Sequence, residues 1–230
     1  MIAGNDGYRS LCYFKGKDGD GMEKINYDRK MREQIAKMEG RPSLLLHSCC
    51  GPCSTAVIER VAEDFDVTVF YYNPNIDDRE EYELRKANQI DYIQKRYGKD
   101  GPVGFLEGAY DPSVFFEKCR GHEGDPEGGE RCRLCFELRL TETARKAKEL
   151  DFDYFATTLT VSPMKNAQII NLLGEAIGAE NGVNFLFSDF KKRGGYQRSI
   201  ELSREYGLYR QHYCGCSLSD ITTKDHDSSV

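Results

Sequence analysis

The stretch that decides the fold is Leu44-Leu45-Leu46-His47-Ser48-Cys49-Cys50-Gly51-Pro52-Cys53-Ser54. Its three leucines form a short apolar run, which predicts a buried β-strand. A Gly-Pro step then breaks the chain, and the apolar residues of 55–61 predict a helix. Three thiols therefore lie on a strand-to-helix turn, the place where ligands bind in open parallel α/β sheets. Helix N-terminal amides favour negative charge and lower the pKa of nearby thiols, so this turn is suited to thiolate chemistry.

Further strands and helices alternate along the rest of the chain. Strand patterns cover residues 66–72, 101–106, 153–158 and 183–187, and helix patterns cover 27–39, 79–97, 112–119, 132–150, 166–181 and 196–206. This alternation predicts an α/β fold with a mostly parallel, Rossmann-like sheet and helices on both faces. We expect a loose extension over residues 1–25, a single catalytic domain over 26–218 and a polar tail over 219–230.

Composition narrows the class of protein. The 230 residues contain 32 Lys and Arg against 38 Asp and Glu, so the net charge is −6. This balance argues against generic electrostatic binding of nucleic acid, although a local basic patch can still hold RNA. The apolar runs are too short to span a bilayer, and the first residues lack the apolar core of a secretory signal. Nine cysteines in such a chain indicate a cytoplasmic, reducing compartment and metal or redox chemistry.

The cysteines are grouped in a way that favours a metal centre. Three groups stand out: Cys49-Cys50-x-x-Cys53, Cys132-x-x-Cys135 and Cys214-x-Cys216. Thiolates from separate segments can hold either tetrahedral zinc or an iron–sulfur cluster. Adjacent cysteines reach different corners of a cluster more readily than they reach one small ion. Zinc and a cluster both stay open at this point, with the adjacent pair favouring the cluster.

The third cysteine group has a different geometry. Cys214 and Cys216 are separated by one glycine and can close a very small disulfide ring. Strain makes such a ring easy to reduce and suits it to electron transfer. The alternative is that both thiols are two more metal ligands.

Two other titratable residues lie near the predicted strand ends. His47 directly precedes the thiols, either as a buried strand residue with one hydrogen bond or as a proton donor or ligand. Asp189 follows a strand, either as a turn or capping residue or as a catalytic acid. A basic cluster comes next in the chain: Lys191, Lys192, Arg193 and Arg198. It is either a solvated face or a phosphate contact.

Two nucleotide-binding patterns are missing. A pyrophosphatase-type loop would place Ser-Gly-Gly-x-Asp-Ser after the first strand, but this chain has Ser-Cys-Cys-Gly-Pro-Cys-Ser there. The loop lacks the small glycines that let backbone amides approach a phosphate, so use of ATP is not supported. No G-x-G-x-x-G follows a strand, so no dinucleotide site is indicated.

Taken together, five motifs carry a resemblance over residues 26–216. They are LLLHSCCGPCS, FYYNPNI followed by EEY, the GG-x-RC-x-x-C loop, TTLTVSP and the terminal HYCGC. This combination resembles the cobalamin-independent epoxyqueuosine reductase family. The resemblance implies removal of the epoxide oxygen from epoxyqueuosine at the tRNA wobble position. The products would be queuosine and water, from a two-electron reduction.

The resemblance also implies a cofactor and a set of site residues. The family carries a 4Fe–4S cluster with an additional iron beside it. By position, the implied cluster ligands are Cys49, Cys50, Cys132 and Cys135, the implied redox pair is Cys214 and Cys216, and Cys53 would bind the second iron. Asp189 or His47 would protonate the leaving oxygen. Cys12 and Cys119 match no motif.

The implied partners are a tRNA and an electron donor. The anticodon loop would present its modified base unstacked from its neighbours. Neither the identity of the donor nor an oligomeric state follows from the resemblance. Three alternatives stay open: an iron–sulfur tRNA-thiolating enzyme that needs ATP, a zinc-stabilised RNA-binding module, and a metal-free C-x-x-C thiol–disulfide oxidoreductase.

Overall fold

The structure, a computed structural model, describes residues 25–211 and 213–218. Most of the predicted N-terminal extension, with Cys12, and the predicted tail over 219–230 lie outside the described residues. Among the described helices, none combines the length and the apolar character that crossing a bilayer requires.

Five parallel strands form one sheet. They are β1 (Ser43–His47), β2 (Asp66–Tyr71), β3 (Gly104–Glu107), β4 (Tyr154–Thr157) and β5 (Asn184–Phe185), in the spatial order β3-β2-β1-β4-β5. Every strand pair is parallel, which confirms the predicted fold class. The order reverses at β1, so the chain leaves β1 toward β2 and returns on its other side at β4. A crevice opens at such a reversal, beyond the carboxyl ends of the strands.

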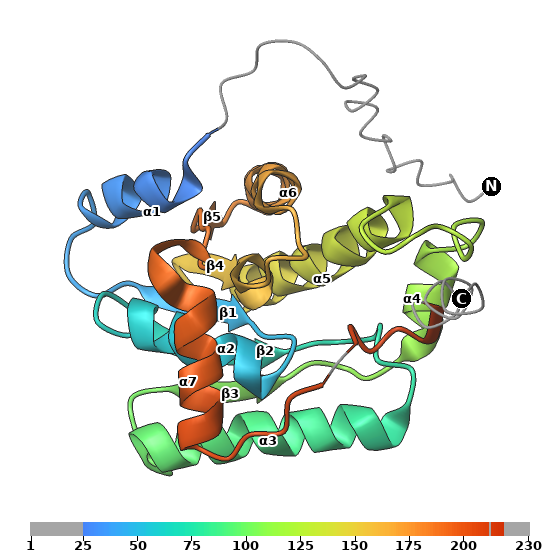
Figure 1. The fold of residues 1–230 in the computed structure, drawn as a ribbon. Coiled ribbons are helices and arrows are strands. Elements are labelled where there is room, and N and C mark those ends of the chain that lie inside the picture. The colour runs from blue at the N-terminus through green and yellow to red at the C-terminus, as the bar shows by residue number, and fades with distance from the viewer. Residues whose placement is uncertain (1–24, 212, 219–230) are drawn as a thin grey trace.

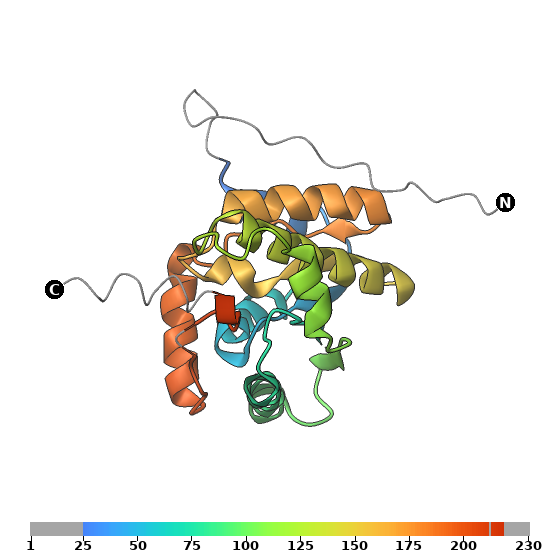
Figure 2. The same ribbon diagram turned by 90° about the vertical axis from the view of Figure 1, so that its right-hand side faces the viewer.

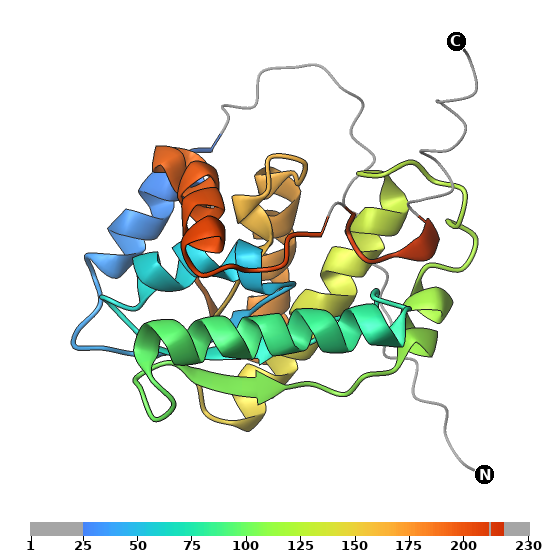
Figure 3. The same ribbon diagram turned by 60° about the horizontal axis from the view of Figure 1, so that its bottom comes forward.

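Helices cover both faces of this sheet (Figures 1 and 2). They are α1 (Tyr27–Ile35), α2 (Gly51–Val61), α3 (Arg79–Tyr97), α4 (Pro112–Lys118), α5 (Glu130–Glu149), α6 (Ala167–Asn181) and α7 (Gly195–Glu205), with 3₁₀ turns η1 (Thr158–Val161) and η2 (Lys192–Gly194). One face is covered by α2 and α3, with α7 packed along α2, and the other by α5 and α6. The described residues after α7 run toward α4 and the start of α5 (Figure 3).

The central strand shows why the sheet is buried on both sides. Leu44 and Leu46 pack with α2 and α3, whereas Leu45 packs with α5 and α6. All three leucines have no exposed surface, because successive side chains point to opposite faces. An uninterrupted apolar run is the pattern of a strand covered by helices on both faces. The leucine run thus fixes β1 at the centre and places the thiol turn in the crevice.

The structure changes some of the predicted boundaries. The first helix ends at Ile35 instead of residue 39, and the predicted loop over 159–165 includes part of η1. The helix predicted from residue 132 begins at Glu130, after Gly129 in extended conformation. This earlier start matters for the site, because it places Cys132 and Cys135 in the first two turns of α5.

Candidate functional site

The turn after β1 brings three thiols together. The sulfur atoms of Cys49, Cys50 and Cys53 all lie within 4.8 Å of one another, a spacing that allows one metal ion to be bound by all three. The Sγ atoms of Cys49 and Cys50 are 3.9 Å apart. Helix α2 begins at Gly51, directly between them and Cys53.

Helix α3 holds this turn in place. Ser48 and Ser54 each donate a hydrogen bond from Oγ to Oε1 of Gln89, both at 2.7 Å. Gly51 is needed for the close approach of the two segments, because a Cβ there would lie 2.9 Å from Nδ2 of Asn88 and 3.2 Å from its carbonyl oxygen. Polar side chains of α3 therefore fix the backbone that carries the three thiols.

The three thiols do not ionise alike. Neighbouring thiols of Cys50 and Cys53 hold the pKa of Cys49 well below its usual range. Burial, together with Cys49, raises the pKa of Cys50 to about 12. The pKa of Cys53 is raised by the thiols of Cys49 and Cys50 and by burial. Because the three thiols lie so close together, ionisation of one of them opposes ionisation of the others.

Two further thiols come from the start of α5. The Sγ of Cys132 accepts a hydrogen bond of 3.2 Å from the backbone N–H of Gly128. Cys135 is buried and packs in an apolar cluster with Phe115, Cys119 and Cys216. Burial raises the pKa of the Cys135 thiol to about 12. A thiol in such surroundings is neutral unless a metal or another cation stabilises its charge.

The C-terminal pair is held by a buried arginine. Arg85 donates from Nη1 to the carbonyl oxygen of Cys214 at 3.1 Å, and its Nε is 2.6 Å from Oε1 of Glu81. Asn75 donates to the same carbonyl of Cys214 at 3.4 Å. No disulfide joins any two of the eight cysteines in the described residues.

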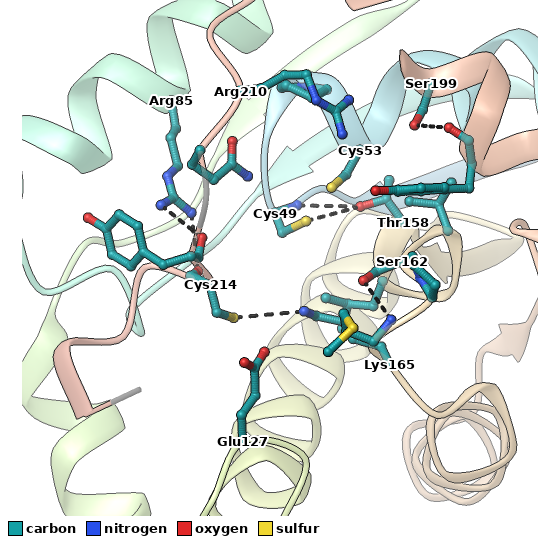
Figure 4. Close-up of a pocket in the computed structure, with 18 residues that line it drawn as sticks. Cys49, Cys53, Arg85, Glu127, Thr158, Ser162, Lys165, Ser199, Arg210 and Cys214 are labelled. Atoms are coloured by element: carbon teal, nitrogen blue, oxygen red, sulfur yellow. Dashed lines mark hydrogen bonds between the residues drawn. The ribbon is translucent and has the colours of Figure 1, made fainter. Parts of the chain in front are cut away.

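Two adjoining hollows connect the three cysteine groups. Cys49, Cys53 and Cys214 line a cavity of about 280 Å³, drawn in Figure 4. A small apolar hollow of about 30 Å³ beside it has four thiols in its wall: Cys132, Cys135, Cys214 and Cys216. Cys214 and Lys165 line both hollows. The structure thus gathers cysteines from all three predicted groups around one crevice.

Cations outnumber anions in the wall of the larger cavity. Its charged lining residues are Arg85, Lys165 and Arg210 against the single carboxylate of Glu127. Nζ of Lys165 lies 3.9 Å from Sγ of Cys214, and electrostatic interaction with Cys214 raises the pKa of Lys165. Figure 4 shows the Lys165 and Cys214 side chains pointing toward each other across the cavity. The excess of cations suits a ligand that carries negative charge.

Arg139 lies in the wall of the smaller hollow without an acidic partner. Its side chain is 1% exposed, and its Nε donates to the carbonyl oxygen of Cys135 at 3.3 Å. Nη1 and Nη2 have no hydrogen-bond partner among the described residues. Burial opposes the positive charge, yet Cys135, Cys214, Cys49 and Cys132 together hold the pKa of Arg139 above its ordinary value.

His47 is enclosed within the sheet, directly before the thiol turn. It has no exposed surface, and its Nδ1 lies 2.9 Å from Oγ1 of Thr157 and its Nε2 3.1 Å from the carbonyl oxygen of Tyr72. Burial and the charge of Arg139 lower its pKa to about 3. His47 therefore joins the end of β1 to Thr157 of β4 and to Tyr72, the residue after β2, as a neutral ring.

Asp189 lies beside the main cavity. Its Oδ1 is 3.1 Å from Nζ of Lys191, and both residues line a hollow that shares Pro163, Met164 and Lys165 with the cysteine-lined cavity. The predicted acid therefore lines a neighbouring hollow and is not among the residues that line the cysteine-lined cavity.

Several site residues were missed by the sequence analysis. Lys165 lies at the end of the predicted loop after β4. Its place beyond the carboxyl end of a strand could have marked it, because ligands bind there in open parallel sheets. Arg139 follows Cys132 and Cys135 at helical spacing, which places all three on one side of α5. Glu127 lies in the Gly-rich loop before α5, and nothing in its local pattern marks it.

The chain is similar to known proteins over most of its length. A family model described as "Epoxyqueuosine reductase QueH" matches residues 44–222. A relative of that name from Streptococcus pyogenes serotype M1 is 47% identical over 199 residues, covering 84% of this chain and 78% of the relative. Another, from Staphylococcus epidermidis, is 44% identical and covers 84% of each chain.

A more distant relative carries the same name. "Epoxyqueuosine reductase QueH" of Thermotoga maritima is 32% identical over 188 residues, which are 82% of this chain and 95% of the relative. The matched residues of the family model span β1 to β5, the thiol turn and the first turns of α5. The chain therefore belongs to the epoxyqueuosine reductase QueH family, whose members are oxidoreductases of tRNA modification.

Proposed function

We propose that this chain reduces epoxyqueuosine to queuosine at the wobble position of tRNA. Both C–O bonds of the epoxide break and a carbon–carbon double bond forms. Two electrons come from an unidentified donor, and the oxygen leaves as water after taking up two protons. The observation that carries the proposal is the meeting of the three cysteine groups beside one positively lined cavity.

A 4Fe–4S cluster with an additional iron fits these residues. The proposed cluster ligands are Cys49, Cys50, Cys132 and Cys135, and Cys53 is the proposed ligand of the additional iron. Thiolate sulfur is the ligand type of iron–sulfur clusters, and the unpartnered guanidinium of Arg139 is suited to neighbouring negative charge. When bound, the iron centre supplies single electrons and a Lewis acid, which no side chain offers.

The residues of this chain would bind and orient the substrate. Lys165 and Arg210 supply positive charge in the cavity wall, and Tyr196, which is 38% exposed at that cavity, offers a ring on which an unstacked base can lie. Asp189 is the proposed source of a proton for the leaving oxygen. Cys214 and Cys216 would pass electrons to the site through reversible oxidation to a disulfide.

The tRNA partner fits a local basic feature of the surface. Lys192 and Arg193 on η2 are exposed and form no ion pair with any other described residue. They closely precede Tyr196, which lines the cavity, and Lys192 lines the hollow that shares Met164 and Lys165 with it. Contact of these cations with tRNA phosphates is part of the proposal. With tRNA as the substrate, the cytoplasm is the proposed place of the reaction.

Nucleoside analysis tests the reaction. In cells that lack this chain, we expect tRNA digests to contain epoxyqueuosine in place of queuosine by mass spectrometry. Expression of the unchanged chain should restore queuosine. Unchanged queuosine in the cells without the chain would overturn the proposal.

Anaerobic reconstitution tests the ligand set separately. Replacement of both Cys132 and Cys135 by alanine should abolish retention of iron and sulfide, because two thiolate ligands are removed. Cys119→Ala is the matched control, because Cys119 is buried in the same apolar cluster but is not a proposed ligand. Equal iron in the double variant and the control would contradict the assignment. A colourless zinc protein would favour the RNA-binding alternative, and activity after chelation of iron would favour the thiol–disulfide alternative.

A further inference from the structure

Arg139 is a buried cation that has no carboxylate partner among the described residues. Its side chain is 1% exposed, and no described carboxylate lies within ion-pair distance of its nitrogens. It contacts the carbonyl oxygen of Cys135 and the ring of Phe136, whose centroid is 5.7 Å from Cζ. Two of its nitrogens have no hydrogen-bond partner among the described residues. Burial of an unpaired charge costs on the order of several kcal/mol, so this charge needs an explanation.

Arg85 is equally buried but has an acidic partner. Arg85 is also 1% exposed, but its Nε lies 2.6 Å from Oε1 of Glu81 and its Nη1 donates to the carbonyl of Cys214. The fold therefore does place a carboxylate beside one buried arginine. Near Arg139 it places the thiols of Cys132, Cys135 and Cys214 instead.

The charge state of those thiols determines whether Arg139 has a negatively charged partner. A protonated thiol carries no charge and compensates nothing, whereas a metal-bound thiolate is negative. The same small hollow is lined by Arg139 and by cysteines from α5 and from the C-terminal segment. A cysteine-ligated iron centre at this place would therefore supply the missing negative charge.

We propose that Arg139 is a positioning residue whose fixed positive charge balances the cysteine-bound iron centre and favours its more reduced state. This inference rests on the iron–sulfur centre of the proposed function. Arg139 itself is not a proposed ligand of that centre. A nearby cation stabilises whichever redox state is more negative, and therefore raises the reduction potential.

Paired measurements on the chelated and the iron-loaded protein test this role. Arg139→Leu removes the charge, Arg139→Lys keeps it, and Arg85→Leu is the matched control at an equally buried but paired arginine. In the chelated protein we expect Arg139→Leu to be as stable to urea as the unchanged chain, or more stable. Arg85→Leu should be less stable in both states, because Glu81 loses its partner.

In the iron-loaded protein, loss of the Arg139 charge should weaken the iron centre. Arg139→Leu should release iron to a chelator about tenfold faster, and its midpoint potential in an anaerobic spectroscopic titration should be more negative. Arg139→Lys should stay close to the unchanged chain in both measurements. None of these readouts depends on turnover.

The outcomes separate this inference from the proposed function. If chelated Arg139→Leu is destabilised as strongly as Arg85→Leu, and its loaded form has an unchanged potential, Arg139 is a structural residue. The iron centre itself would still stand. If the unchanged chain holds no iron and sulfide after anaerobic purification, the proposed centre and the role of Arg139 are both wrong.

Discussion

At the scale of single residues, the site depends on side chains that fix thiols as well as on the thiols. Arg85 holds the carbonyl of Cys214, and Gln89 holds the turn that carries Cys49. Both supports come from α3, a helix without cysteines. The positions of thiols at the crevice are thus set by polar contacts from a neighbouring helix. Substitutions that disturb those contacts should therefore displace the thiols.

Gly215→Ala is expected to disturb the C-terminal pair directly. Gly215 has φ +100°, and a Cβ there would lie 2.8 Å from Cγ1 of Ile76 and 3.0 Å from Nη1 of Arg85. The arginine that holds Cys214 would have to move. We expect kcat/KM for the tRNA substrate to fall about tenfold, the equivalent of ~1.4 kcal/mol of transition-state stabilisation. The alkylation rate of Cys214 should change in the same variant.

Gly207→Ala is the control for backbone strain alone. Gly207 also has a positive φ, +63°, but no atom lies within 4 Å of the position of its Cβ. This variant should lose about 1–2 kcal/mol of stability and keep the unchanged kcat/KM. An equal fall of kcat/KM in both variants would show that the contact with Arg85 has no role.

At the scale of elements, α7 connects the cavity to the helical layer. Tyr196 and Ser199 of α7 line the cavity, while Arg198 faces Glu59 on α2. The two helices pack against each other, so α2 carries the thiol turn at its start and supports the cavity wall through α7. The element that presents Cys53 therefore also positions a wall for the substrate.

The ion pair between these helices makes stability depend on pH. Nε and Nη2 of Arg198 donate to the two carboxylate oxygens of Glu59, at 2.9 and 3.0 Å, and this contact lowers the pKa of Glu59. The stabilisation is complete above the ordinary glutamate pKa of about 4.3 and disappears as the pH falls through the lower folded-state value. Glu59→Gln should cost about 1 kcal/mol at pH 7, given the partial exposure of the pair.

Urea midpoints of the unchanged chain and Glu59→Gln at several pH values provide the measurement. The difference in unfolding free energy should be constant from about pH 7 to pH 5 and should shrink at lower pH. A difference that stays the same down to about pH 3 would mean that the carboxylate charge is irrelevant to the contact.

The basic turn η2 is expected to set affinity for tRNA. The double variant Lys192→Glu with Arg193→Glu should weaken tRNA binding and make it less dependent on salt. The slope of the logarithm of the binding constant against the logarithm of the salt concentration should become shallower by about 0.7–0.9 for each phosphate that is no longer neutralised. Lys99→Glu with Lys148→Glu is the control, with the same change in net charge. Both control lysines are exposed and lie before β3 and β4, at the opposite edge of the sheet.

Filter-binding titrations at several salt concentrations separate the two double variants. If both bind tRNA equally weakly, the net charge of the chain governs binding. The assignment of η2 to the tRNA interface would then be wrong.

At the scale of the whole molecule, the sequence was sufficient for the architecture but not for the charge environment of the site. The leucine run and the alternation of strands and helices predicted the parallel sheet, because periodicity reports which faces are buried. The motifs predicted which thiols to group. The spacing of Arg139 from Cys132 and Cys135 was available, but its lack of a partner was not, because an unpaired buried charge is defined by atoms that come from distant segments. Likewise, His47 is enclosed by contacts with Thr157 and Tyr72. Both residues are distant from His47 in the sequence, so the pattern around His47 could not predict these contacts.

The order of the cysteine groups along the chain has a consequence for biosynthesis. The thiol turn after β1 is translated early, the start of α5 near the middle, and Cys214 and Cys216 only after all five strands have been made. A nascent polypeptide still on the ribosome can display two of the groups but cannot close the crevice around them. Enclosure of any bound centre must therefore wait until the segment with Cys214 has emerged and docked against α3.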